Sequence, residues 1–161
     1  MKLQPGHAVP LSPLPLVALR VHDAAGGACA LVEGARAGLR GDLPLLSASG
    51  AALWLGADLF LAQMRHAETL APDAAGLLAP WPVLDCRNAP GLALDALRKG
   101  VAAVVLEATD PAFATVAAIA ESGGRRVLEP AQLRAAGPFA AGDPALTAWL
   151  VRLRDTAGRL G

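Results

Sequence analysis

The sequence has few charged residues, no excess of either sign of charge and only two cysteines. Lys and Arg together number 14, and Asp and Glu also number 14, so the formal net charge is zero. Nucleic acids and anionic membranes select basic surfaces, and we therefore expect neither as a partner. The basic pairs Arg98–Lys99 and Arg125–Arg126 are isolated and fall at the ends of expected elements, where cations suit a helix C-terminus.

Disulfides and long apolar runs are also missing. Cys29 falls on an expected helix and Cys86 at an expected strand end, which is not a disulfide framework. Prolines at positions 5, 10, 13 and 15 interrupt any apolar segment of a secretory signal. No run of about 18 apolar residues exists, as a membrane-spanning helix would need. We therefore expect a cytoplasmic protein without a membrane span.

Hydrophobic residues, many of them alanine, dominate the composition. They make up 54% of the chain, whereas charged residues make up 17%, against about 25% in an average domain. So few charges leave little with which to cover the surface of a monomer. The composition therefore predicts an apolar self-association patch and a homo-oligomer.

The middle of the chain, residues 81–129, alternates between strand-like and helix-like segments. Apolar runs at 81–84 and 102–106 indicate strands, a further strand begins at 126–128, and the segments between them have helical spacing. The run at 102–106 is wholly apolar, which is typical of a parallel strand covered on both faces. Asp110 followed by Pro111 predicts the N-cap and first residue of a helix.

The rest of the chain extends this alternation. Residues 14–21 and 43–47 read as strands, and residues 28–39, 57–70 and 131–136 as helices, with a turn at 24–27 and Trp54 and Leu55 as core or lid residues. Residues 143–159 form an amphipathic helix, because Leu146, Trp149, Leu150 and Leu153 recur at helical spacing. We therefore expect a proline-rich arm over 1–13 followed by one domain over 14–161.

Strands that alternate with helices of about ten residues predict an α/β fold with about five mostly parallel strands. An open, doubly wound sheet of the Rossmann or flavodoxin type is the first expectation. Half of a (β/α) barrel is the alternative, because there are too few strands to close a full barrel.

Ligands of parallel α/β sheets bind beyond the carboxyl ends of the strands. Several polar side chains follow the expected strands and are candidates for such a site: His22, Ser47, Ser49, Asp85, Arg87, Asn88 and Glu107. Asp85 and His22 are candidates for catalytic acid and base, because a carboxyl at a sheet edge is partly desolvated. The other five are candidates for binding a small anionic ligand.

Each candidate also has a structural interpretation. Asp85 can cap the helix that begins near Pro90 or pair with Arg87, and residues 47–50 can be a polar turn. Cys86 suits a buried, inert thiol better than a nucleophile. Gly26 and Gly27 lack both phosphate-binding fingerprints. No spacing predicts a metal site, and no motif identifies a cofactor.

Two functions remain open at this point. The first is a non-catalytic accessory or interaction protein that works by self-association or by binding a partner. The alternative is a small-molecule enzyme of the lyase or isomerase type, acting on an anionic metabolite at the strand ends. An enzyme needs one concave pocket that holds Asp85, Arg87 and His22. In an interaction protein, the rim formed by the carboxyl ends of the strands should be flat or filled, and the largest apolar patch should lie elsewhere.

Overall fold

The computed structural model describes residues 6–11 and 14–159 of the 161-residue chain. The strands are β1 (His7–Ala8), β2 (Leu16–Arg20), β3 (Leu39–Leu46), β4 (Leu78–Asp85), β5 (Ala103–Val105), β6 (Arg126–Leu128) and β7 (Leu133–Ala136). The helices are α1 (Ala24–Arg36), α2 (Ala57–Leu70), α3 (Pro90–Lys99), α4 (Phe113–Ser122) and α5 (Pro144–Arg159). Three 3-10 turns join them: η1 (Ala51–Leu53), η2 (Pro72–Ala74) and η3 (Pro130–Gln132).

The strands form one parallel sheet in a simple order. That order is β6-β5-β4-β3-β2-β7, and the short β1 pairs with the start of β3. Every pairing is parallel. The predicted α/β class, with a parallel sheet that alternates with helices, is therefore confirmed.

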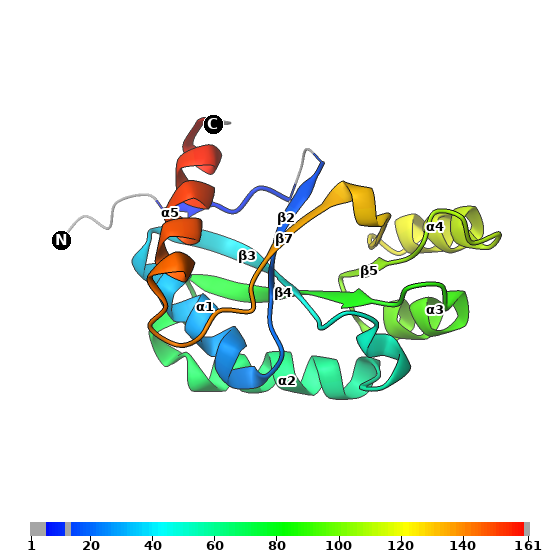
Figure 1. The fold of residues 1–161 in the computed structure, drawn as a ribbon, viewed down its shortest axis with the longest axis horizontal. Coiled ribbons are helices and arrows are strands. Elements are labelled where there is room, and N and C mark those ends of the chain that lie inside the picture. The colour runs from blue at the N-terminus through cyan, green and yellow to red at the C-terminus, as the bar shows by residue number, and fades with distance from the viewer. Residues whose placement is uncertain (1–5, 12–13, 160–161) are drawn as a thin grey trace.

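The sheet is strongly curled (Figure 1). β6 and β7 lie at opposite ends of the strand order but are joined by residues 129–132 alone. Five residue steps reach at most about 18 Å, whereas the outer strands of a flat six-stranded sheet lie roughly 24 Å apart. The strands from β2 to β6 are also adjacent in sequence order without reversal. This order favours the half-barrel arrangement over the doubly wound one.

The helices follow the same order around the outside of the sheet. α1 packs on α2, α2 on α3 and α3 on α4, while α5 packs on the free side of α1. The larger core lies between these helices and the sheet. A smaller apolar cluster fills the inner face and consists of Leu16, Ala18, Leu46, Val83, Ala103, Val105 and Leu128. Both faces of β5 are therefore buried, which explains its wholly apolar sequence.

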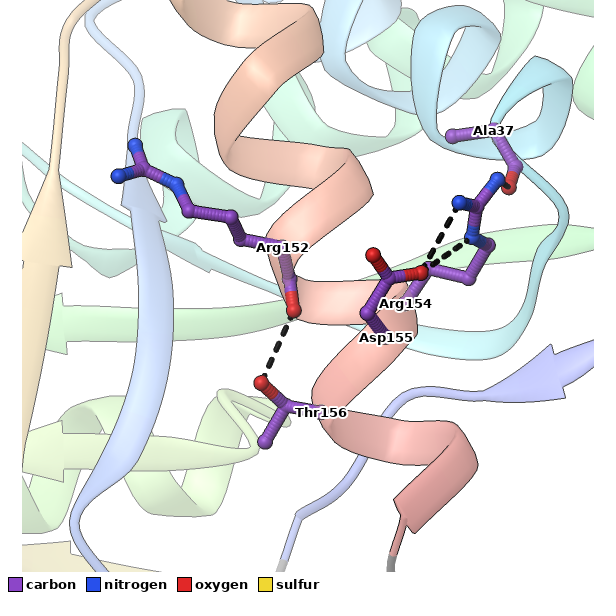
Figure 2. A network of polar contacts seen from close by, with 5 residues as sticks. All are labelled: Ala37, Arg152, Arg154, Asp155 and Thr156. Atoms are coloured by element: carbon purple, nitrogen blue, oxygen red, sulfur yellow. Dashed lines mark hydrogen bonds and ion pairs between the residues drawn. The ribbon is translucent and has the colours of Figure 1, made fainter.

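The helix α5 uses its apolar face within the domain. Leu146, Leu150 and Leu153 are buried, and the helix packs on α1 and β1. Near its end, Arg154 Nη1 donates a hydrogen bond to Ala37 O, the C-cap residue of α1, over 3.2 Å (Figure 2). The predicted amphipathic helix is thus a packing element.

The predicted arm over 1–13 falls partly on residues 1–5 and 12–13, which lie outside the described residues. In the part that is described, His7 N donates to Gly38 O over 2.9 Å and Val9 N donates to Arg40 O over 3.1 Å. Val9 is buried. This segment therefore packs against the domain.

Three predicted elements were wrong. Residues 24–27 are the first turn of α1, because Asp23 Oδ1 accepts a hydrogen bond from Gly26 N over 2.7 Å and caps the helix. Residues 133–136, predicted as helix, form β7 and pair with β2. The helix expected directly after Asp110 begins at Phe113, because the Asp110 carboxylate caps the turn before it and accepts from Ala112 N over 2.9 Å.

Candidate functional site

Ser47 connects three strands at the carboxyl end of the sheet. Its side chain is almost fully buried, at 1% exposure. Its Oγ accepts a hydrogen bond from Asp85 N and donates one to Ala48 O, both over 3.0 Å. Its carbonyl oxygen accepts from Arg20 Nη1 over 2.6 Å. The structure therefore gives Ser47 contacts that position its neighbours. Sequence reasoning missed Arg20, although a charged residue that ends an otherwise apolar strand was a usable signal.

Asp85 ends β4 and organises the turn that follows. It is half-buried, and its Oδ1 accepts a hydrogen bond from Arg87 N over 3.1 Å. The N-cap of α3 is Ala89, so Asp85 does not cap that helix. The Asp85 carboxylate instead holds the backbone of Arg87 in place.

Arg87 adopts an unusual backbone conformation. Its φ of 48° lies in the left-handed region, which costs a residue other than glycine roughly 1 kcal/mol. Asp85 bonds its N–H, and its carbonyl oxygen accepts from Glu107 N over 2.8 Å. Its guanidinium donates through Nη2 to Ser49 Oγ over 2.7 Å. A Cβ on Gly50 would come within 2.9 Å of Arg87 Nε, so this glycine leaves room for the side chain.

A cavity of about 460 Å³ opens beside Arg87. Two charged residues face it from the ends of β4 and β5, namely Arg87 and Glu107, and both are exposed. The remaining lining residues are Asn88, Thr109, Asp110 and Pro111. The Asp110 carboxylate already accepts a backbone hydrogen bond. Within residues 6–11 and 14–159, neither Arg87 nor Glu107 forms an ion pair.

His22 lies elsewhere on the rim. It is exposed and lines a separate cavity of about 290 Å³ together with Arg20 and Phe139. Arg87 lines the cavity of about 460 Å³ and not the cavity that His22 lines. Asp85 lines neither of the two. The structure thus brings Ser47, Ser49, Asn88 and Glu107 close to Asp85 or Arg87 but places His22 in a different hollow.

Cys86 is fully buried behind the rim. Burial, and secondarily the charge of Asp85, raise the pKa of the Cys86 thiol to about 12. The thiol is therefore protonated at neutral pH and lacks the thiolate that a nucleophile or metal ligand needs. Among the residues that the structure describes, no three His, Cys, Asp or Glu side chains are placed to hold a metal ion. No helix in this part of the chain is both long and apolar enough to cross a bilayer.

Large apolar side chains are exposed beside this rim. Trp54, expected in the core or as a lid, is 65% exposed, next to Leu53 at 56%. Leu59 (58%) and Leu92 (39%) line a nearby recess of about 230 Å³. The turn η1, which contains Leu53, packs against α3, which contains Leu92. We refer to Leu53, Trp54, Leu59 and Leu92 as the Trp54 patch.

No protein-family model matches this chain, and no curated protein matches its sequence.

Proposed function

We propose that the protein is a non-catalytic accessory protein that self-associates through the Trp54 patch. The observation that carries this proposal is the clustering of exposed apolar side chains. Seven large hydrophobic side chains are exposed among the described residues, and four of them form this patch. Exposed apolar side chains that gather on neighbouring elements, here η1, α2 and α3, are typical of interaction sites. The homo-oligomer expected from the composition, and the expected cytoplasmic location, are part of the same proposal.

The size of the patch suggests a reversible dimer. Each of the four side chains is roughly half exposed, so its burial would contribute about 1 kcal/mol. An isologous dimer would bury eight such side chains and gain on the order of 8 kcal/mol. Association costs roughly 4–15 kcal/mol in lost translational and rotational freedom. We therefore expect an equilibrium that depends on protein concentration.

The charges around the patch favour a second copy of this chain as the partner. Lys99 Nζ pairs with Asp58 over 2.8 Å and with Asp95 over 2.9 Å at the edge of the recess. A two-fold interface places the same surface against itself, so it must be self-complementary. A surface that carries both signs of charge meets this requirement, whereas a surface of one sign would repel its own copy.

The rim is hollowed rather than flat or filled, but the separation of its side chains supports a non-catalytic role. Lyase- or isomerase-type chemistry with Asp85 and His22 as acid and base would need both groups at one reacting centre, with Arg87 as the anchor. His22 and Arg87 line different cavities. The Asp85 carboxylate is engaged with the backbone of its own turn.

Sedimentation velocity across a wide range of protein concentrations tests self-association. The parent should show a dimer that dissociates on dilution, and the double variant Leu53→Ser/Trp54→Ser should stay monomeric. Ile119→Ser is the matched control, because Ile119 is similarly exposed (45%) on α4. A monomeric parent at every concentration, or equal weakening by the control, would contradict the proposal.

A further inference from the structure

We infer that the cavity between Arg87 and Glu107 binds a small zwitterion that carries one carboxylate and one ammonium group, as a free α-amino acid does. The inference concerns a ligand site and does not depend on self-association. The fold positions one exposed guanidinium, that of Arg87, through several contacts.

Three separate features hold the Arg87 side chain at the mouth of the cavity. The backbone is kept in the left-handed region by the Asp85 carboxylate and by Glu107 N. Gly50 has no Cβ, and the Arg87 side chain lies in the space that a Cβ would fill. Ser49 Oγ accepts one guanidinium hydrogen bond. Glycine or asparagine would adopt this φ more easily, and the structure keeps a strained arginine there.

A positioned guanidinium selects an anion. Its remaining N–H groups can bind a carboxylate through two parallel hydrogen bonds. Because the hydrogen bond to Ser49 already restricts the side chain, less conformational freedom is lost on binding. The cavity lies at the carboxyl ends of β4 and β5, where parallel sheets bind their ligands. Its volume of about 460 Å³ is enough for a small organic molecule.

The acidic groups of the cavity require a cation on the same ligand. Glu107 is exposed into the cavity and, within the described part of the chain, has no ion-pair partner. Asp110 adds a second negative charge. A purely anionic ligand would be repelled by both carboxylates, whereas an ammonium group near Glu107 would be attracted. Asn88 and Thr109 supply neutral hydrogen-bonding groups.

A main-chain hydrogen bond holds the backbones of Arg87 and Glu107 side by side. It joins Glu107 N to Arg87 O over 2.8 Å, so the two side chains leave a fixed pair of backbone positions. They nevertheless form no ion pair with each other. A ligand with both charges would form one ion pair with Arg87 and one with Glu107 at the same time.

Isothermal titration calorimetry tests the inference with a panel of free α-amino acids. Each amino acid is titrated beside its deaminated acid and its decarboxylated amine. At least one amino acid should bind, and its acid and amine should each bind at least about tenfold more weakly, since each loses one charged hydrogen-bonded pair. Failure of every amino acid to bind, or equal binding by the corresponding acid, would overturn the zwitterion.

Two variants locate the site. Arg87→Asn removes the guanidinium but accepts the left-handed conformation, so the fold is kept and binding of the amino acid should fall at least about tenfold. Glu107→Gln should bring the affinities for the amino acid and its acid together. Arg65→Asn, at an exposed arginine on α2, is the control and should bind as the parent does. Unchanged binding by Arg87→Asn would overturn the inference, and unchanged binding by Leu53→Ser/Trp54→Ser keeps this test separate from self-association.

Discussion

Replacing Ser47 by alanine should destabilise the protein strongly for so small a change. Ser47 is buried, and its Oγ is the acceptor for Asp85 N at the end of β4. Alanine keeps the backbone and the Cβ but removes this acceptor. The substitution therefore separates the hydrogen bond from the packing of the strand.

The expected loss follows from the group that is left without a partner. A buried polar group that loses its only hydrogen bond costs about 1–3 kcal/mol, and Ser47 Oγ also gives up its bond to Ala48 O. We expect the free energy of unfolding to fall by about 2 kcal/mol. For a domain of this size, that corresponds to a melting temperature lower by roughly 4–8 °C.

Urea denaturation followed by circular dichroism measures this effect. The midpoint should fall while the dependence on urea concentration stays the same, which marks a change in stability rather than in compactness. Ser122→Ala is the control, because the Ser122 hydroxyl also donates to a carbonyl, that of Ile119, but is exposed. If Ser47→Ala costs no more than Ser122→Ala, the reasoning about the rim is refuted.

Three further predictions concern one buried thiol and two glycines. Because burial raises the pKa of Cys86 to about 12, the folded protein binds more protons than the unfolded chain above pH 9.0. The free energy of unfolding should therefore fall by up to about 1.4 kcal/mol per pH unit between pH 9.0 and about 12. A series of thermal melts across this pH range should show a flatter stability profile for Cys86→Ala. Gly27→Val should lower stability by about 2 kcal/mol, because even a Cβ at this position would lie 3.0 Å from Ala67 Cβ. Gly91→Ala, on α3 with open space around it, should raise stability by about 0.5 kcal/mol in the same urea assay. A pH profile unaffected by Cys86→Ala, or a tolerated Gly27→Val, would contradict the packing described for these sites.

The sequence predicted best where the pattern is local. The run at 102–106 predicted a strand buried on both faces, and Ala103, Val104 and Val105 are all buried. The repeat of Leu146, Leu150 and Leu153 predicted an amphipathic helix, whose apolar side is buried. The first helical turn of α1 was wrongly predicted as a separate turn, because Gly26 and Gly27 resemble a loop unless Asp23 is recognised as the helix cap.

The site was only partly predictable. The rule that polar residues gather at the carboxyl ends of parallel strands correctly grouped Ser47, Asp85 and Arg87, which are linked by hydrogen bonds. The same rule also included His22, which lines another cavity. The carboxyl ends of parallel strands lie at the same edge of the sheet, as the rule assumes. The curl of the sheet decides which cavity each side chain lines, and the rule does not include it.

The sequence by itself determined the α/β class and most of the elements, because helix and strand periodicity depend on residues close along the chain. Tertiary structure alone decided that residues 133–136 are a strand, since the pairing of β7 with β2 joins segments more than a hundred residues apart. It also decided that Trp54 is exposed and that Arg87 is held in the left-handed region. The second outcome depends on neighbours that only the folded chain supplies, namely the groups of Asp85 and Glu107 that hold the arginine.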